Sequence, residues 1–404
     1  MCKAAVVTGA TGFLGSHLVA GILGENSDVI VICLARPKDG YTAWERVVRA
    51  VARAYRDRNG QDEPAGWAER AIVVEHELGS DGVRPAGVAD VAGRVFEIGE
   101  FWHCAAAVEF AGERGGHVWR ANVDGLRNAL AIADKFGARV FNHVSTAYVA
   151  GKRTGRITEA LDPSPRAYNN IYEESKHIGE HFVARHCRLS KMNFRIFRPS
   201  IIVGHSRTRC ASSDAGLYQA VGQFATFARV MRAKSPGYFH SRTLKVRLDR
   251  EGTLDMIPVD IAVAEMLDLA AVGARTFGQV FHITSESPVS AHDAVRLALE
   301  MVGVERVKVV GPDADFNFAD RMFNRSLKFY APYFGQRKIF ARTRVARYGV
   351  DRHQLRYLMD LDRLRGFISH HLATRRVAPV EAEVGGFGLG LGISNVSHPE
   401  MMIA

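Results

Sequence analysis

Short apolar runs alternate with amphipathic stretches through the first half of the chain. The run Ala4–Thr8 passes into a glycine-rich turn, after which Leu14, Leu18 and Ile22 form one apolar stripe. Continuous apolar runs are typical of buried strands, and a stripe repeating every three to four residues is typical of a helix. The alternation continues to about residue 205. It predicts strands at 29–34, 72–74, within 95–105, and at 140–144 and 194–197. It also predicts a long, mostly helical insertion at 39–70 and helices at 122–136 and 172–186.

This order of elements predicts an α/β fold with a doubly wound parallel sheet of the Rossmann type. The strict alternation fades after Gly204, although a strand at 280–284 and helices at 291–302 and 350–376 follow. We therefore expect a smaller C-terminal domain beside the sheet. The predicted division is 1–204 with 255–285 for the sheet domain, 205–254 with 286–380 for the smaller domain, and 381–404 for a glycine-rich flexible tail.

The segment 316–340 is unusually rich in aromatic residues. Two interpretations stay open for it: an apolar wall or membrane-facing surface, or the core of the smaller domain. The aromatic positions are Phe316, Phe318, Phe323, Phe329, Tyr330, Tyr333, Phe334 and Phe340.

The turn after the first strand has the spacing of a dinucleotide-binding loop. Gly9 permits the tight turn, Gly12 lets backbone approach a pyrophosphate at the helix N-terminus, and Gly15 lets helix and strand pack closely. Strand, glycine turn and helix in this order are the context that such a loop requires. We predict that the loop binds a nicotinamide dinucleotide through Gly9, Thr11, Gly12, Phe13, Leu14 and Gly15.

The second strand ends in basic residues. Sites specific for NAD usually place an acidic residue here to bind the ribose 2′-hydroxyl. This chain has Arg36 and Lys38 instead. A guanidinium can bind a 2′-phosphate through two hydrogen bonds, so we predict NADPH as the cofactor, with Arg36 as the main contact; a solvated basic turn is the alternative.

Three residues have the types and order needed for acid catalysis during hydride transfer. Tyr172 and Lys176 stand four apart and so share one helix face, and Thr146 follows the predicted strand 140–144. A lysine ammonium near the phenol is expected to lower the tyrosine pKa toward neutrality, and the tyrosine can then exchange a proton with a substrate oxygen. Thr146 can hydrogen-bond the same oxygen.

Composition and cysteine content limit the class of protein and the compartment in which we expect it. Of the 404 residues, 47% are hydrophobic and 24% charged, which is ordinary for a globular protein, and no run reaches the 18 apolar residues of a spanning helix. The five scattered cysteines indicate a reducing compartment without a zinc site, so we expect a cytoplasmic protein with no bound metal.

The basic excess lies in the later part of the chain. Residues 1–150 hold 16 Lys and Arg against 18 Asp and Glu, and the rest hold 37 against 25. A polyanionic substrate handle, nucleic acid and a generally basic surface could each account for it. No nucleic-acid motif accompanies the charge, so we do not expect nucleic acid as a partner.

Several segments resemble the extended short-chain dehydrogenase/reductases and, within them, the fatty acyl-CoA reductase and thioester-reductase (male-sterility-like) family. The resemblance covers roughly residues 3–290. The segments that carry it are Arg36–Gly40 with Glu45-Arg46 after it, His103–Phe110, Asn122–Gly125, Val144–Val149, Asn170–Lys176, Arg198–Ser200 and Asp255–Asp260. His76-Glu77-Leu78 departs from the family's usual Gly-Asp-Leu, which puts an adenine contact by Glu77 in doubt.

The resemblance implies roles for these positions. Thr146, Tyr172 and Lys176 would be the catalytic residues, and Tyr172, Lys176, Ala105, Asn122, Pro199 and Ile201 would belong to the cofactor site. It also implies an acyl thioester of coenzyme A or of an acyl-carrier protein as substrate, with an aldehyde or alcohol as product. A homodimer and a peripheral membrane contact stay open.

Two other functions also stay open. One is an ordinary extended-family dehydrogenase or epimerase acting on a sterol, sugar nucleotide or ketone. The other is a regulator that senses NADP(H) without catalysis, although such a protein needs no proton donor, and Thr146, Tyr172 and Lys176 occur here in order.

Overall fold

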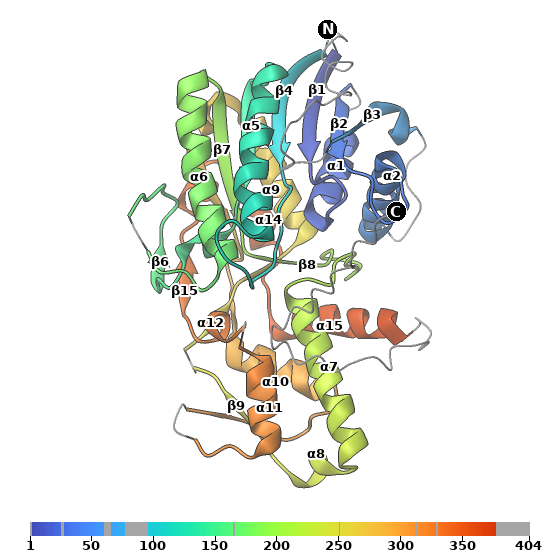
Figure 1. Cartoon of the computed structure of the whole chain (residues 1–404), viewed down its shortest axis with the longest axis vertical. Helices are drawn as coiled ribbons and strands as arrows, with labels where there is room; N and C mark the ends of the chain where they lie inside the picture. Colours follow the sequence, from blue (N-terminus) through green and yellow to red (C-terminus); the bar gives the residue numbers. More distant parts are fainter. Residues whose placement is uncertain are drawn as a thin grey trace, which may run out of the picture.

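A parallel sheet with helices on both faces forms the larger domain (Figure 1). The computed structural model describes residues 2–25, 28–59, 66–76, 96–164, 166–249, 251–311, 314–328 and 330–376. Seven strands of this part pair in the order β12-β7-β5-β4-β1-β2-β3. They are β1 (Cys2–Thr8), β2 (Ile30–Ala35), β3 (Ala71–Glu75), β4 (Phe96–His103), β5 (Val140–Val144), β7 (Asn193–Pro199) and β12 (Gln279–Ile283). The predicted doubly wound Rossmann-type fold is confirmed.

Successive residues of the central strands pack on opposite faces of the sheet. Val7 belongs to a core with α1 (Phe13–Glu25), α2 (Ala43–Asn59) and α9 (Val259–Ala271). Its neighbour Val6 belongs to a second core with α5 (Gly125–Lys135) and α6 (Ile171–Ser190). Both faces are therefore covered, which is why the strands read as continuous apolar runs.

The strand register brings the chemically interesting residues to one edge. Thr8 pairs with His103, and His103 pairs with His143, so β1, β4 and β5 end at the same level. All strands run parallel, and the segments that leave their carboxyl ends are the glycine loop, residues 104–110 and Ser145-Thr146. Ligands of open α/β sheets bind at this edge.

The smaller domain lies below this edge in Figure 1, and its apolar core extends to Ala147, Tyr148 and Ala150, which follow β5. Its elements are α7 (Leu217–Lys234), α8 (Tyr238–Ser241), β9 (Leu244–Arg247), β10 (Thr253–Leu254), β13 (Val289–Ser290), α10 (Ala291–Met301), β14 (Val307–Val310), α11 (Phe318–Ser326), α12 (Ala331–Phe334) and α15 (Leu361–Arg376). β9 pairs with β14, and β10 pairs with β13.

Short strand pairs connect the two domains. β6 (Gly155–Ile157) pairs with β15 (Lys338–Phe340), and β8 (Ile201–Val203) pairs with β11 (Met256–Pro258). The chain thus enters the smaller domain after β8, returns through α9 and β12, and enters it again after residue 285. We keep the predicted domain division as a proposal.

Helix boundaries differ from the predictions at three places. The mostly helical insertion predicted at 39–70 contains α2 and, in its last described part, a single 3-10 turn at Trp67–Arg70. The helix predicted at 122–136 begins earlier, as α4 (His117–Trp119) and a π turn at Arg120–Asp124. The helix predicted at 350–376 is two helices, α14 (Arg352–Leu355) and α15, because the Asp360 carboxylate accepts the Arg363 N–H at 2.8 Å and caps a new helix.

Two features named from the sequence lie outside the described residues, namely Glu77 and the tail 381–404. Within the described ranges, no helix is both long and apolar enough to cross a membrane.

Candidate active site

The glycine loop is held in a conformation that only glycine permits. Gly9 has φ of 73°, and a Cβ there would lie 2.6 Å from the Ala105 backbone nitrogen. A Cβ on Gly15 would lie 2.1 Å from the Gly9 carbonyl oxygen. Such distances are too short for carbon, so β1, α1 and the end of β4 pack at backbone distance. Ala105, a predicted cofactor residue, is part of this packing.

The loop opens on a cavity of about 360 Å³ at the carboxyl edge of the sheet. Gly9, Gly12, Phe13, Leu14 and Gly15 line it, and the N-terminus of α1 adjoins it. Unpaired backbone N–H groups at a helix N-terminus suit a pyrophosphate, so the loop fits the dinucleotide predicted from the sequence.

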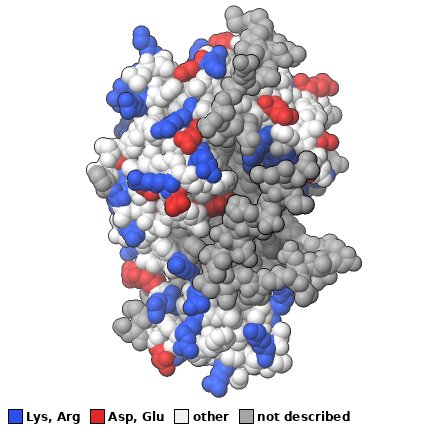
Figure 2. All heavy atoms as spheres, in the orientation of Figure 1, with Lys and Arg blue, Asp and Glu red and all other residues white. Residues whose placement is uncertain are grey.

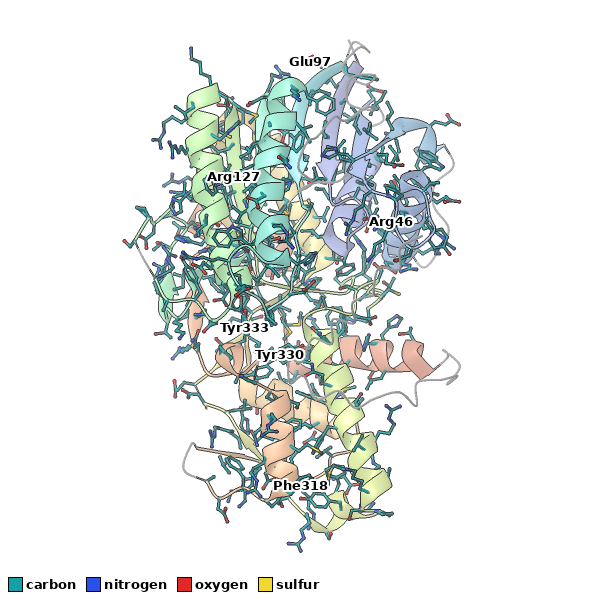
Figure 3. The ribbon with its side chains drawn as sticks, viewed as in Figure 1. Arg46, Glu97, Arg127, Phe318, Tyr330 and Tyr333 are labelled. Atoms are coloured by element: carbon teal, nitrogen blue, oxygen red, sulfur yellow. The ribbon has the colours of Figure 1, made fainter. Side chains whose placement is uncertain are left out.

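Basic residues lie beside Thr11 of the glycine loop. Thr11 does not line the cavity; its hydroxyl instead accepts a hydrogen bond from the Arg46 guanidinium at 3.3 Å. Arg46 also donates to the Arg36 carbonyl oxygen. Arg36 and Lys38 are exposed, and Lys38 pairs with Asp39 at 3.8 Å. Sequence reasoning gave Arg46 no role, although its place in the first turns of α2, just after the basic turn, was a usable signal (Figure 3).

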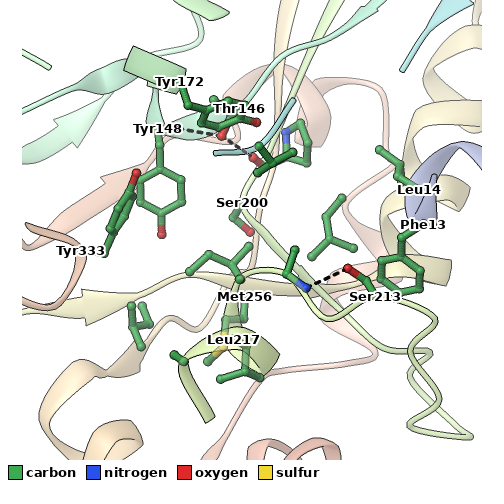
Figure 4. A pocket seen from close by; sticks show the side chains of 18 of the residues that line it. Phe13, Leu14, Thr146, Tyr148, Tyr172, Ser200, Ser213, Leu217, Met256 and Tyr333 are labelled. Carbon is green, nitrogen blue, oxygen red and sulfur yellow. Dashed lines mark hydrogen bonds between the residues drawn. The ribbon is translucent and has the colours of Figure 1, made fainter. Parts of the chain in front are cut away.

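Thr146, Tyr172 and Lys176 all line the same cavity (Figure 4 shows Thr146 and Tyr172). Thr146 follows β5, and its hydroxyl accepts the Tyr148 N–H at 3.3 Å and donates to the Pro199 carbonyl at 3.5 Å. Tyr172 and Lys176 lie in the first turns of α6, whose N-cap is Asn170. The sheet edge and one helix therefore bring together the three residues predicted to be catalytic.

Burial decides the protonation of the pair on α6. It raises the pKa of Tyr172 to about 12, against a smaller lowering by a hydrogen bond with Thr146. Burial also lowers the pKa of Lys176 to about 8, and its Nζ donates to the Val144 carbonyl at 2.6 Å. The expectation that Lys176 brings the Tyr172 pKa toward neutrality is therefore wrong for the ligand-free protein. Tyr172 is a protonated phenol, which makes it a proton donor.

Asn122 holds the cavity wall and does not face the cavity. Its side-chain oxygen accepts the Ala107 N–H at 2.8 Å, and its nitrogen donates to the Ala107 carbonyl and the Ser175 hydroxyl. It thereby ties the loop after β4 to α6. Its predicted place in the cofactor site stays a prediction.

Cys104 also lines the cavity, where burial raises the pKa of its thiol to about 12. A thiol with such a pKa is protonated at neutral pH and is a poor nucleophile. This favours the interpretation of Cys104 as a packing residue.

The smaller domain supplies the far wall of the cavity, and this wall is apolar. Pro199 and Ile201, both predicted near the nicotinamide, line the same cavity. The residues of the far wall are Leu217, Ala220, Val221 and Phe224 from α7, Ala294, Val295 and Ala298 from α10, and Leu254, Met256, Tyr330, Tyr333 and Phe334. Sequence reasoning did not identify the residues of α7 and α10, since their apolar faces read like any packed helix.

The aromatic segment 316–340 combines both predicted roles. Tyr330 and Tyr333 belong to the core of the smaller domain and also line the cavity, at the junction of the two domains in Figure 3. Phe323 is fully buried, whereas Phe318 is 65% exposed at the far end of α11.

A Rossmann-type sheet, a glycine loop and a buried Thr-Tyr-Lys set define the class of the protein. It is an oxidoreductase of the short-chain reductase and epimerase type, with a nicotinamide cofactor. Residues 7–266 match the family described as male sterility protein, so the chain belongs to that family. The resemblance to fatty acyl-CoA reductases and thioester reductases is confirmed.

Curated relatives support the assignment. The chain is 26% identical to fatty acyl-CoA reductase 2 of Homo sapiens over 315 residues, which cover 70% of this chain and 58% of the relative. It is 26% identical to aldehyde reductase lnaA of Aspergillus flavus over 320 residues, covering 74% and 27%. The aligned part is thus 27% to 58% of the length of these relatives.

Solved structures share the fold. The terminal R domain from the myxalamid PKS-NRPS biosynthetic pathway has a TM-score of 0.68 at 20% identity, covering 92% of this chain and 90% of that one. UDP-glucuronic acid 4-epimerase from Bacillus cereus, in complex with NAD, has a TM-score of 0.59 at 16% identity, with 94% and 99% covered.

Proposed function

We propose that the protein reduces an acyl thioester to the aldehyde with NADPH. The observation that carries this proposal is that one cavity has both proton-donating groups beside the glycine loop and an apolar wall leading away from them. An acyl chain fits such a wall, because burying its methylene groups is favourable and needs no polar partner. The fatty acyl-CoA reductases among the relatives support the same substrate class.

The cavity residues divide the chemical work. When bound, the nicotinamide supplies a hydride to the thioester carbonyl carbon. Thr146 and Tyr172 hydrogen-bond the carbonyl oxygen, and Tyr172 gives it a proton. The resulting hemithioacetal loses its carbon–sulfur bond, so that the sulfur leaves as a thiol with a proton and an aldehyde remains. Lys176, one turn along α6 from Tyr172, would hold the cofactor ribose when the cofactor is bound.

Basic residues near the glycine loop favour the phosphorylated cofactor. Arg36 and Lys38 are exposed on the turn after β2, and Arg46 reaches Thr11. Cations in this position stabilise a 2′-phosphate by charge-assisted hydrogen bonds. We therefore propose NADPH over NADH, with Arg46 added to the residues predicted from the sequence.

The surface of the smaller domain suits an anionic carrier for the acyl group. Three exposed basic residues lie near the cavity wall, namely Arg321 and Arg325 on α11 and Lys328 just after it. Lys328 stands two residues before Tyr330, which lines the cavity. Lys and Arg outnumber Asp and Glu on the lower lobe in Figure 2. Such a field steers the phosphates of coenzyme A or an acidic carrier protein toward the cavity.

Mixing the purified protein with NADPH and acyl-CoAs from octanoyl to hexadecanoyl tests the proposal. Loss of NADPH absorbance should be matched by release of free thiol, and Tyr172→Phe should abolish both while NADPH still binds. One NADPH per thiol indicates the aldehyde, and two indicate the alcohol. Thiol release without NADPH oxidation, or oxidation without thiol, contradicts thioester reduction.

The apolar wall argues against a sugar-nucleotide substrate, whose many hydroxyl groups would need polar partners. A ketone or sterol dehydrogenase would oxidise NADPH with its ketone and release no thiol from acyl-CoA. A protein that only senses NADP(H) would bind the cofactor equally well after Tyr172→Phe and would have no turnover to lose, because binding does not require the phenol proton.

A further inference from the structure

Several side chains that line the cavity carry hydroxyl groups, including Ser213, Tyr330 and Tyr333. Two other hydroxyl groups lie close to Thr146 in Figure 4. They belong to Tyr148 and Ser200, and the carboxyl group of Asp255 lies behind them. Figure 4 shows the Tyr148 ring extending away from Thr146 into the cavity, with Ser200 between Thr146 and Met256. A chain that starts at the catalytic residues and runs toward Leu217 passes these hydroxyl groups first.

Tyr148 is held rigidly. Its ring packs edge-on against Tyr333, with 4.9 Å between the ring centroids, and against Phe340, with 5.8 Å. The side chain is 7% exposed, so the position of its hydroxyl is fixed by packing and not by solvent.

The hydroxyl of Tyr148 still has a proton to donate. The Asp255 backbone makes a hydrogen bond that lowers the Tyr148 pKa, which means that the phenol oxygen accepts it. Burial raises the pKa more strongly, so the phenol stays protonated. Within the described residues, no acceptor for this proton is found.

Ser200 and Asp255 form the accepting side. The Asp255 carboxyl accepts the Ser285 N–H at 2.8 Å, and burial raises its pKa to about 6. The Ser200 hydroxyl lies beside this carboxyl, and its hydrogen bond to Asp255 lowers the Asp255 pKa, although the geometry of that bond is not standard. Its exposed fraction is 6%, so water offers little compensation.

Buried hydroxyl groups with incomplete hydrogen bonding cost free energy, about 1–3 kcal/mol each. A site that keeps them in an apolar cavity discriminates strongly in favour of a ligand that completes their hydrogen bonds. The required ligand group accepts a hydrogen bond from the Tyr148 hydroxyl and donates one to the Ser200 oxygen. An alcohol does both, whereas a methylene group does neither.

We propose that Tyr148 and Ser200 bind a hydroxyl group on the acyl chain, a few carbons from the reacting carbonyl, and so select hydroxyacyl over plain acyl substrates. The inference rests on the proposed function for the placement of the acyl chain. The substrate class is then a 3-hydroxyacyl thioester or a near homologue.

Equilibrium binding tests the subsite without turnover. Decanoyl-CoA and the two enantiomers of 3-hydroxydecanoyl-CoA are titrated into the protein with NADP⁺, which has no hydride to give. One enantiomer should bind about tenfold or more tightly than decanoyl-CoA, because each completed hydrogen bond is worth about that factor. In Tyr148→Phe the ratio of the two dissociation constants should fall to about one, and Ser200→Ala should lower it in part.

Tyr333→Phe is the matched control. Tyr333 lines the same cavity and contacts Tyr148, but its hydroxyl already accepts the Asn170 side-chain N–H at 2.7 Å. Its removal should change the affinities for both ligands alike and leave their ratio intact. Equal affinities in the wild type, a ratio that survives Tyr148→Phe, or no binding of either ligand each overturn the subsite.

Failure of the subsite and failure of the proposed function are distinguishable. Thiol release from both substrates at equal kcat/KM, with no hydroxyl preference in binding, refutes only the subsite. A binding preference that depends on Tyr148, without thiol release from any acyl-CoA, refutes only thioester reduction. If 3-oxodecanoyl-CoA binds more tightly than 3-hydroxydecanoyl-CoA, Ser200 and Asp255 do not accept a hydrogen bond from the ligand.

Discussion

The buried ammonium of Lys176 should make the protein less stable at neutral pH than at alkaline pH. The pKa falls from 10.5 to about 8 because burial penalises the charged form. At 1.36 kcal/mol per unit, this shift corresponds to about 3 kcal/mol. Between pH 8 and 10.5 the unfolded chain keeps a proton that the folded protein has released. Unfolding therefore binds a proton, and the free energy of unfolding rises with pH across this interval.

Comparison with Lys176→Met isolates this effect, since methionine keeps an unbranched chain but carries no charge. The free energy of unfolding of each protein, without cofactor, is measured by urea denaturation from pH 7 to pH 10.5. The wild-type value should rise relative to the variant by about 3 kcal/mol over this range. Lys152→Met, which removes an exposed charge, controls for the change in net charge. A difference between wild type and Lys176→Met that stays constant with pH would refute the reasoning.

Three further predictions concern activity and cofactor binding. Tyr172→Phe should lower kcat by about 10²–10⁴-fold in steady-state assays, because general acid catalysis is lost, while the NADPH dissociation constant stays within about twofold; an undiminished kcat excludes Tyr172 as proton donor. Arg46→Ala should weaken NADPH binding by about tenfold or more in fluorescence titrations and leave NADH binding unchanged. Equal losses of affinity for the two cofactors would show that Arg46 does not contact the 2′-phosphate. Ala298→Leu narrows the cavity beside α10, so kcat/KM for hexadecanoyl-CoA should fall about tenfold relative to kcat/KM for octanoyl-CoA. If the ratio of these two kcat/KM values does not change, the acyl chain does not reach α10.

The sheet was predictable because each of its strands carries a local signal. The run Val140–Val144 is buried on both faces, so it reads as continuous apolar sequence and its end places Thr146 without ambiguity. The glycine loop is equally local, since Gly9 and Gly15 are required by backbone contacts within one strand–turn–helix unit. Tyr172 and Lys176 follow from the spacing of a single helix.

The far wall of the cavity depends on contacts between distant segments. Phe224 and Ala298 lie on different helices of the smaller domain. The sequence pattern around each of them is the same as for a residue that only packs a core. Arg46 acts through a contact across 35 positions, with Thr11. The pKa of Tyr172 was mispredicted because helical spacing shows that Lys176 is near, but not that both side chains are desolvated.

The repeated crossing of the chain between its two domains limits how specificity could be transplanted. Part of the cavity wall comes from α7, before the return to the sheet at residue 255, and another part comes from α10 and Tyr330, after it. The intervening stretch contains β12, the edge strand of the sheet. A chimera with a homologous reductase therefore needs two separate exchanges around a retained centre, and a single C-terminal swap would join part of one acyl pocket to part of another.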